Sequence, residues 1–354
     1  MTDYGTLTGT PVATLTGLAV GDALGMPFET SRPDDPRLVA WDGGYGSSEY
    51  HKLGPGQWTD DTQMSLALAR SLIERGVYDP ACAAEHYLSD FYKEARGIGK
   101  TTHSAMAAMS PMQGASGPLT PLPWNRSGSL DSIGNGTAMR AAPIGLLYRA
   151  PRPGTLILGP TWQDRVIELA RAAAHWARVD ATITHRTHEA REGAAAVAAG
   201  VSFLAAGVVK DKLLLAVVEL LEPSDVRFVL EDLWRRRDRG EADLGAVIAA
   251  RPLVNTDPAK GIPARVVETV HAAFACFVWT EYFRDAVRRA IRLGGDTDTV
   301  GAITGALAGT YYGLENIPRK LVETLERADE IHALEQRLVH LPGWKLDVEA
   351  RVAP

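Results

Sequence analysis

Apolar residues recur at helical spacing along most of the chain. Segments rich in leucine and alanine place an apolar residue every three or four positions, which is the period of a helix with a buried face. The strict alternation of a half-buried strand is scarce, although residues 338–352 could hold a short extended pair. We therefore predict an all-α fold. The expected helices cover roughly residues 10–24, 61–75, 80–95, 100–109, 137–149, 162–178, 187–206, 209–221, 224–237, 264–279, 281–292, 299–312 and 318–337.

Two long irregular stretches interrupt this pattern, at residues 27–56 and 111–136. The second is rich in proline, glycine and serine. Helices of similar character continue on both sides of each stretch, so neither has the properties of a linker between domains. We expect one compact multi-helix domain over residues 1–354, in which these loops carry function, as long loops inside a domain often do.

The charge balance argues against a protein that binds a nucleic-acid backbone. The chain has 37 lysines and arginines against 43 aspartates and glutamates, which gives a net charge of −6. A protein that neutralises phosphates is normally basic. The one marked basic run, at residues 235–239, follows Glu231 and Asp232 and is typical of a solvated helix face.

Neither a disulfide framework nor a membrane segment is expected. Cys82 and Cys276 are too few and too far apart for a disulfide framework or a cysteine metal site, and they fit buried thiols in a reducing compartment. The N-terminus lacks the basic region of a signal peptide. The most apolar segment, residues 193–209, is short and rich in alanine and glycine, which favours a buried helix over a membrane span. These features predict a cytoplasmic protein.

Two acid-rich motifs stand at expected helix starts. The first is Thr59-Asp60-Asp61-Thr62-Gln63. It can be explained as an N-terminus that Thr59 or Asp60 caps and that Gln63 completes as a capping box. The alternative is a cation site, because two adjacent carboxylates and a hydroxyl offer hard oxygen ligands for Mg²⁺, Mn²⁺ or Ca²⁺.

The second acid-rich motif is Gly294-Gly295-Asp296-Thr297-Asp298-Thr299. Capping explains one of its two acids, whereas Asp296 and Asp298 would face one ion from an extended segment. An EF-hand does not fit, because Val300 and Leu307 occupy ligand positions. The helix that follows carries glycines at positions 301, 305, 309 and 313, a spacing that predicts close approach of a neighbouring helix.

Two further acids occur near the N-terminus. Asp22 interrupts an apolar helical stretch and, once buried, must find hydrogen bonds or a cation. Glu29 lies just beyond Pro27 on the first long loop, where a lone glutamate is normally solvated.

The last two motifs carry no acid cluster. Gly134, Asn135 and Gly136 could form a turn and N-cap, or an anion cradle of backbone amides at a helix start. His185 and His188 stand three residues apart, but no third ligand accompanies them and HExxH is absent. We therefore expect His185 to make a polar contact and not to bind a metal.

Taken together, five stretches resemble the ADP-ribosylglycohydrolase family. They occur in family order as GDALGMPFE, WTDDTQM, GNGTAMRAAPIG, THRTHEA and GGDTDTVGAITGALAG, and they span residues 21 to 309. One difference is Glu189, which stands where many relatives have a proline nearby, so the shape of that loop is left open.

The resemblance implies an all-α domain with a cleft that holds two divalent cations. Glu29 matches the glutamate of the loop after GDALG, and His185 matches a histidine that reaches ADP-ribose. The positions that match metal ligands are Thr59, Asp60, Asp61, Asp296, Asp298 and Thr299. The positions that match the loop contacting the diphosphate are Gly134, Asn135 and Gly136.

Our hypothesis is a metal-dependent hydrolase that cleaves the bond between ADP-ribose and a protein side chain or small acceptor. Glu29, Asp60 and Asp298 would be catalytic, with Glu29 as general base or as a residue that controls access of the attacking water. Two divalent cations would offset the repulsion among five clustered acids. Mg²⁺ is the expected ion, with Mn²⁺ close behind, because no soft ligand is near in sequence. Arginine, serine and small-molecule or nucleobase glycosides remain open as acceptors.

Three other functions compete with this hypothesis. A phosphatase of the D-x-D-x-[TV] type needs a buried strand before Asp296, where a helix end and a glycine turn are expected. A prenyl-transfer enzyme with D-D-x-x-D would need an acid where Met64 stands. A silent ADP-ribose-binding or structural relative would have lost metal ligands, and here every expected ligand is present.

Overall fold

The computed structural model describes residues 12–110, 121–151, 161–249, 257–341 and 343 of the chain. Within these ranges the regular structure is helical, with five isolated β-bridges and no strand, so the all-α prediction is confirmed. The α-helices are α1 (Thr14–Gly25), α2 (Pro36–Ala40), α3 (Asp60–Arg75), α4 (Pro80–His86), α5 (Lys100–Met109), α6 (Trp124–Ser127), α7 (Ala142–Leu147), α8 (Trp162–Ala181), α9 (His188–Ala206), α10 (Lys210–Val218), α11 (Asp225–Asp238), α12 (Leu244–Ala249), α13 (Val266–Val278), α14 (Phe283–Arg292), α15 (Thr297–Tyr312), α16 (Arg319–Glu323) and α17 (Ala328–His340).

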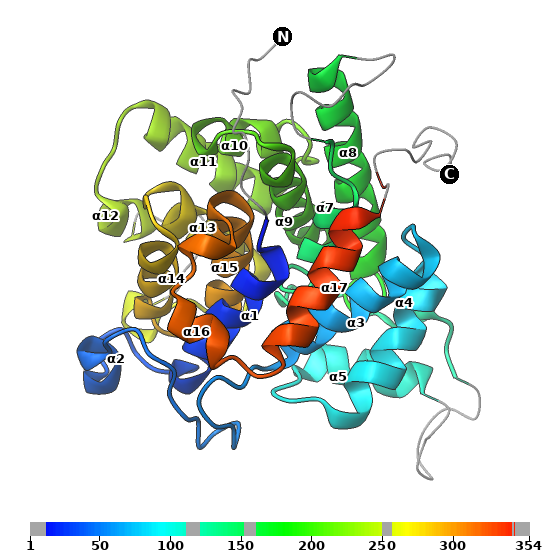
Figure 1. Cartoon of the computed structure of the whole chain (residues 1–354), viewed down its shortest axis with the longest axis horizontal. Coiled ribbons are helices and arrows are strands. Elements are labelled where there is room, and N and C mark those ends of the chain that lie inside the picture. The colour runs from blue at the N-terminus through cyan, green and yellow to red at the C-terminus, as the bar shows by residue number, and fades with distance from the viewer. Residues whose placement is uncertain (1–11, 111–120, 152–160, 250–256, 342, 344–354) are drawn as a thin grey trace.

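Helices α1 and α15 form the tightest pair in the molecule and lie side by side at its centre (Figure 1). Glycines of the two helices face one another without side chains between them. A Cβ atom added at Gly21 would lie 2.0 Å from the carbonyl oxygen of Gly301, and one at Gly305 would lie 2.1 Å from that of Gly17. The predicted close approach is therefore confirmed for residues 301, 305 and 309, whereas Gly313 ends the helix with a φ of 80°.

This contact brings together the segments that carry the acid motifs. The C-terminal end of α1 meets the N-terminal end of α15, where the Thr297 hydroxyl donates a 2.7 Å hydrogen bond to the Gly25 carbonyl. Helix α3 also packs against α1. Helix α1 thus places both acid-rich helix starts at one end of the central pair.

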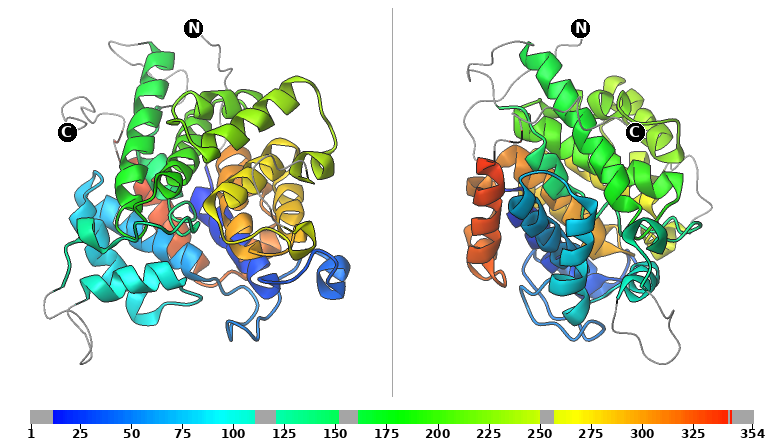
Figure 2. Two further views of the ribbon diagram at one scale, coloured as in Figure 1. Left: turned by 180° about the vertical axis from the view of Figure 1, so that it is seen from behind. Right: turned by 90° about the vertical axis from the view of Figure 1, so that its right-hand side faces the viewer.

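The other helices surround this centre. Helices α13, α14 and α9 pack on α15, and α8 packs along α9. Helix α17 packs on α1 and α3 and lies at the edge of the molecule in the right-hand view of Figure 2. The predicted apolar segment forms most of α9, which is buried along nearly its whole length. None of the described helices combines the length and apolar character needed to cross a membrane.

Several smaller expectations are also confirmed. Both cysteines are buried and free. The arginine run ends α11 and forms ion pairs with neighbouring acids, including Arg235 with Glu231 at 2.6 Å and Arg236 with Asp232 at 2.6 Å. Such ion pairs are typical of a solvated helix face, as the sequence indicated.

Three predicted helices are wrong in their bounds. The segment 80–95 is α4 followed by a π-helical turn (Tyr87–Phe91) and a 3₁₀ turn (Tyr92–Glu94). The segment 318–337 is two helices, because Arg327 takes a left-handed φ of 57° and the Glu326 amide donates to the Gly56 carbonyl at 2.9 Å. The segment 137–149 starts as a turn, in which the Ala138 amide donates to the Asn135 carbonyl at 2.9 Å. Helix α7 begins only at Ala142, where a proline fits the first turn.

The remaining differences concern loops and the tail. The loop at 27–56 contains the short helix α2, and the stretch at 111–136 contains α6, although residues 111–120 lie outside the described ranges. Helix α12 lies in a segment where none was predicted. The expected extended pair at 338–352 overlaps the end of α17, and most of it lies outside the described ranges.

Glu335 is a buried carboxyl group at the N-terminal end of α1, and we expect it to make the stability of the protein pH-dependent. Glu335 of α17 accepts hydrogen bonds from the Leu15 amide at 2.8 Å and the Thr16 hydroxyl at 3.0 Å. Burial raises the pKa of Glu335 from the usual 4.5 to about 7. The folded protein thus holds a proton that the unfolded chain releases, so this group's stabilising contribution is present below about pH 4.5 and lost as the pH rises through about 7.

We therefore expect Glu335→Gln to remove part of the pH dependence of stability. The difference in the free energy of unfolding, variant minus parent, should be larger at pH 8 than at pH 5 by on the order of 2 kcal/mol. Urea denaturation at both pH values measures this difference. The same difference between variant and parent protein at both pH values would contradict this prediction.

Candidate active site

A cavity of about 520 Å³ opens where the starts of α3 and α15 meet the loops after α1 and α6. Ten of the eleven predicted site residues line it: Glu29, Asp60, Asp61, Gly134, Asn135, Gly136, His185, Asp296, Asp298 and Thr299. Thr59 is the exception and is fully buried behind the wall. The structure therefore brings together residues from Glu29 to Thr299, which lie 270 positions apart in the sequence.

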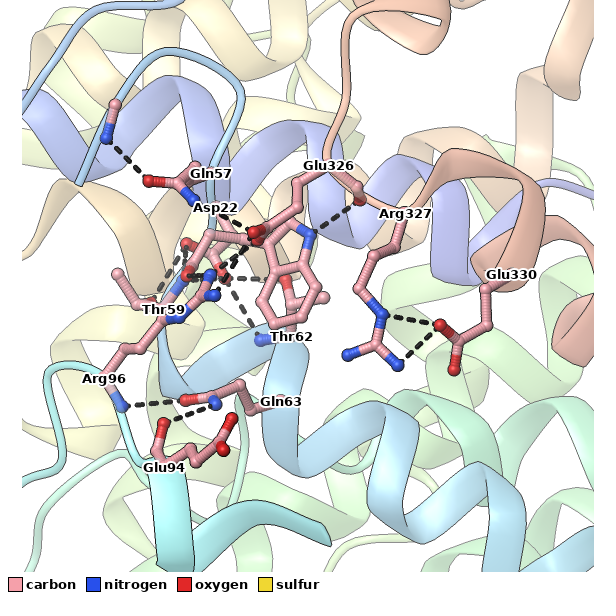
Figure 3. A network of polar contacts seen from close by, with 12 residues as sticks. Asp22, Gln57, Thr59, Thr62, Gln63, Glu94, Arg96, Glu326, Arg327 and Glu330 are labelled. Atoms are coloured by element: carbon pink, nitrogen blue, oxygen red, sulfur yellow. Dashed lines mark hydrogen bonds and ion pairs between the residues drawn. The ribbon is translucent and has the colours of Figure 1, made fainter.

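Asp22 of α1 holds the start of α3 in place (Figure 3). Its carboxylate accepts hydrogen bonds from the backbone amides of Thr59 (3.0 Å) and Thr62 (3.1 Å) and from both hydroxyls, at 3.0 and 2.6 Å. Asp22 thus acts as the N-cap of α3, although it belongs to α1. The sequence prediction that a buried Asp22 needs hydrogen bonds or a cation is met by hydrogen bonds.

The expected capping box at the same helix start is wrong. Thr59 makes no side-chain capping bond. Gln63 instead accepts a 2.8 Å hydrogen bond from the Arg96 amide and donates one of 2.9 Å to the Glu94 carbonyl (Figure 3). Because Asp22 satisfies the amides of this turn, the acids Asp60 and Asp61 are not needed as caps, and both line the cavity.

Two glycines place the second acid motif. Gly294 and Gly295 have φ values of 66° and 78°, a region that favours glycine. They pass between two other segments: a Cβ atom at Gly295 would lie 2.1 Å from the Ile262 carbonyl oxygen, and the Gly295 amide donates a 2.7 Å hydrogen bond to the Ser31 carbonyl. These contacts of Gly295 with Ile262 and Ser31 hold Asp296 at the N-cap position of α15, close to the loop that carries Glu29.

The acids of the two helix starts are buried together. Burial raises the pKa of Asp60, Asp61 and Asp298 well above the usual carboxyl range, and the charges of neighbouring acids add to the effect. Burial also raises the pKa of Asp296, to about 6. A cluster of this kind is stable as carboxylates only with positive charge close by.

One oxygen of this cluster shows what the site could bind. The Oδ1 atom of Asp61 is buried and has no hydrogen-bond partner within the described part of the chain. Its other oxygen accepts from the hydroxyls of Thr59 at 3.3 Å and Thr299 at 3.4 Å. A buried carboxylate oxygen without a donor is expensive, whereas it is a suitable ligand for a divalent cation. The carboxylate and hydroxyl oxygens of this cluster are therefore suitable ligands for the cations that the sequence predicts.

Asn135 contacts the acid cluster, and its role at the diphosphate stays a prediction. Its side-chain nitrogen donates to the Thr269 hydroxyl at 2.9 Å and to the carboxylate of Asp296. These bonds orient Asp296, so the side chain of Asn135 acts on the acid cluster. Gly134 and Gly136 leave room for His185, since a Cβ atom at either glycine would lie within 3.3 Å of its imidazole ring.

His185 is held as a neutral imidazole on the cavity wall. Burial lowers its pKa to about 3, and the charge of Arg140 contributes. The Thr184 hydroxyl accepts a 2.9 Å hydrogen bond from Arg140 and is also hydrogen-bonded to Nδ1 of His185, at 2.9 Å. A neutral imidazole carries one proton and one free lone pair, so His185 can make one further hydrogen bond through Nε2.

His51 is a site residue that the sequence analysis missed. Its side chain is 3% exposed, and Nε2 is hydrogen-bonded to the carboxylate of Glu29. Nitrogen and oxygen atoms of Glu29, His51 and Asp298 lie within 4.8 Å of one another. A single histidine in an irregular loop gives no spacing signal, so only the folded structure reveals this neighbourhood.

Glu29 also lines a second and larger cavity of about 820 Å³. Its other walls come from residues 27–50, the first long loop. Two of its ion pairs are internal, Arg32 with Asp34 at 3.1 Å and Arg37 with Asp35 at 2.9 Å. Glu29 thus stands at the junction of the acid-lined cavity and a cavity built from loop residues.

Comparisons with known proteins identify a family and several proteins that this chain is similar to. The family model described as ADP-ribosylglycohydrolase matches residues 11–346. ADP-ribosylarginine hydrolase Tri1 of Serratia proteamaculans is 26% identical, with 92% of this chain and 78% of that protein covered. ADP-ribosylhydrolase ARH3 of Mus musculus is 28% identical, with 92% and 89% covered. A solved structure titled ADP-ribosylglycohydrolase-related protein complex superposes with a TM-score of 0.68 at 30% identity, over 93% of this chain and 96% of that one.

Proposed function

Since the chain belongs to the ADP-ribosylglycohydrolase family and is a glycosyl hydrolase, we propose that it uses divalent cations to release ADP-ribose from an acceptor. The observation that supports cation dependence is the buried acid cluster with the unpartnered Oδ1 of Asp61. The substrate would be an ADP-ribosylated protein side chain or a small ADP-ribosyl glycoside. A single domain and a cytoplasmic location remain predictions from the sequence.

Six residues would hold the cations: Thr59, Asp60, Asp61, Asp296, Asp298 and Thr299. When bound, two divalent ions would supply positive charge to these acids, orient ribose hydroxyls and polarise a water. Asp22 and Asn135 keep the ligands in place, since Asp22 accepts four hydrogen bonds at the start of α3 and Asn135 donates to Asp296.

The protein groups around them would divide the chemistry as follows. Glu29 would accept a proton from the attacking water as the water oxygen forms a bond to C1 of the ribose and the bond from C1 to the acceptor breaks. The same proton would then pass from Glu29 to the departing acceptor, which restores the carboxylate. The carboxylates stabilise the positive charge that develops at C1. The neutral His185 and the backbone at Gly134 and Gly136 would contact the ADP-ribose on the opposite wall.

We propose that the acceptor lies in the larger cavity beyond Glu29. Its charged lining residues are Glu29, Asp34, Asp35, Glu49, Arg32 and Arg37. Acids outnumber bases there by four to two, which favours a cationic acceptor such as the guanidinium of arginine over a serine hydroxyl.

The test is release of free ADP-ribose from peptides that are ADP-ribosylated on arginine or on serine. Assays with Mg²⁺ or Mn²⁺ and with EDTA should show cation-dependent release, faster from the arginine-linked peptide. Release from neither peptide, with ADP-ribose still bound, would instead support a silent binding protein or a hydrolase of a non-protein glycoside. Release that continues in EDTA would contradict cation dependence.

Glu29→Gln should lower kcat by about 100-fold, because glutamine keeps the shape and the hydrogen bond to His51 but cannot take a proton. The KM for the ADP-ribosylated peptide should change little. The matched control is Glu85→Gln, an exposed glutamate outside both cavities. Full activity of Glu29→Gln would remove the general-base role.

A further inference from the structure

His51 adds a nitrogen atom to a site whose other candidate ligands are all oxygens. We infer that Nε2 of His51 coordinates one of the cations together with Glu29 and Asp298. The centre would then select a first-row transition cation, from Mn²⁺ to Zn²⁺, over Mg²⁺ or Ca²⁺. This inference rests on the proposed cation dependence and concerns which ion the site prefers.

The distances suit a shared ion. One ligand atom from each of the three side chains lies within 4.8 Å of the other two. Ligands at about 2.1 Å from an ion are separated by about 3 to 4.2 Å, depending on the angle between them, so small adjustments would bring all three into coordination. Glu29 needs only Oε2 for this contact, which leaves Oε1 for the attacking water.

The imidazole is also held in place before an ion binds. A Cβ atom at Gly97 would lie 3.0 Å from Cε1 of His51, so this glycine makes room for the ring. The Tyr50 ring packs edge-on, with a centroid distance of 4.7 Å. The His51 amide donates to the Ser48 hydroxyl at 3.2 Å, and Ser48 and Leu53 close the loop by two backbone hydrogen bonds of 2.9 and 3.1 Å. A rigid ligand loses little entropy on coordination.

An independent feature of the same cavity points to a cation. Asp61 is 1% exposed, and its buried Oδ1 has no partner in the described ranges. Asp61 lines the cavity with Glu29 and Asp298, and Thr299 links the starts of α3 and α15 through its contact with Asp61. His51 therefore lies beside two acids, Glu29 and Asp298, of a cavity in which a buried carboxylate oxygen has no partner.

The chemical consequence follows from ligand type. Carboxylate and hydroxyl oxygens suit Mg²⁺ and Ca²⁺, whereas an imidazole nitrogen binds Co²⁺, Ni²⁺ and Zn²⁺ more strongly than it binds Mg²⁺. The sequence favoured Mg²⁺ because no such ligand was near in the motifs. With His51 included, the ligand set becomes mixed, and we expect the protein to bind Co²⁺ at least about tenfold more tightly than Mg²⁺.

The decisive experiment is pulsed electron paramagnetic resonance of the full chain loaded with Mn²⁺ alone. A directly bound imidazole should give ¹⁴N modulation in the parent protein, and His51→Gln should remove it while retaining bound Mn²⁺. His185→Gln and His103→Gln are the matched controls, because His185 lines the same cavity and His103 is exposed outside it. Both should keep the ¹⁴N signal.

Calorimetric titration with Co²⁺ and Mg²⁺ gives a second readout. His51→Gln should weaken Co²⁺ binding by about tenfold or more and change Mg²⁺ binding by less than about threefold. Bound Mn²⁺ without ¹⁴N modulation in the parent protein would overturn the inference and leave His51 as a hydrogen-bond partner of Glu29. No bound Mn²⁺ at all would overturn both this inference and the proposed cation dependence.

Discussion

Asp298→Asn should reduce cation-dependent release of ADP-ribose by about 1,000-fold or more and, in EDTA, should make the protein more stable. The first effect is expected because Asp298 lines the cavity between Asp61 and Glu29, and an amide is a much poorer ligand for a divalent cation. The second follows from electrostatics, since burial and the neighbouring acids raise the pKa of Asp298, and keeping such a carboxyl group in the cluster costs free energy that an amide does not cost.

The magnitudes can be measured separately. Loss of the charge should raise the free energy of unfolding of the cation-free protein by about 1 kcal/mol, or about 2 °C in melting temperature. Asparagine retains an oxygen that can accept the 3.0 Å hydrogen bond from the Thr299 amide, so local geometry should persist. Thermal melts in EDTA and in Mn²⁺, beside the peptide assay, test both effects.

Opposite signs of the two effects separate a functional residue from a structural one. A structural aspartate would lose stability and activity together on substitution. Asp329→Asn is the matched control: Asp329 is exposed in the first turn of α17 and lines neither cavity, so both quantities should stay near those of the parent protein. An Asp298→Asn protein that is less stable in EDTA would contradict the like-charge explanation.

The sequence predicted the helices better than their junctions. Long periodic segments such as 162–178 and 187–206 reappear as α8 and α9 with small changes at the ends. The break between α16 and α17 was not predictable, because it depends on the Glu326 backbone: its amide donates to the Gly56 carbonyl, and its carbonyl accepts from the Trp58 indole at 3.0 Å. Both partners lie some 270 residues away, and local periodicity contains no information about them.

In the candidate site, too, local motifs were easier to predict than contacts between distant segments. Motifs with several chemical groups in a row, such as residues 59–63 and 294–299, were recognisable from the sequence and line one cavity, except for the buried Thr59. Contacts that exist only in the folded protein were not predictable. The sequence did not indicate that Asn135 donates to Asp296, and His51 gave no signal although it contacts Glu29.

Asp22 shows why a pattern can indicate a need without naming the partner. An aspartate in an apolar helix must be satisfied once it is buried. The sequence left open whether hydrogen bonds or a cation do so. The answer depends on α3 beginning beside α1, where four donors from Thr59 and Thr62 meet the Asp22 carboxylate. That geometry exists only in the packed structure.

Gly305→Ala is expected to damage the fold severely, with a loss of at least about 3 kcal/mol in the free energy of unfolding. The added Cβ atom would lie 2.1 Å from the carbonyl oxygen and 2.9 Å from the carbonyl carbon of Gly17. Both are backbone atoms of α1, so no side chain can rotate away. The two helices would have to move apart along their whole contact. Urea denaturation of purified protein, or loss of folded protein on expression, measures the effect.

The same substitution should also impair the site, although Gly305 touches no predicted ligand. Separation of α1 from α15 moves Asp22, which holds the start of α3, relative to Asp296 and Asp298 at the start of α15. Cation affinity should therefore fall even in the fraction of protein that stays folded. Gly54→Ala is the control, because its Cβ atom would meet only the end of the Gln57 side chain, at 3.6 Å, and its stability should change by less than about 0.5 kcal/mol. Equal stability of the two variants would show that the central pair tolerates a wider spacing than its glycines indicate.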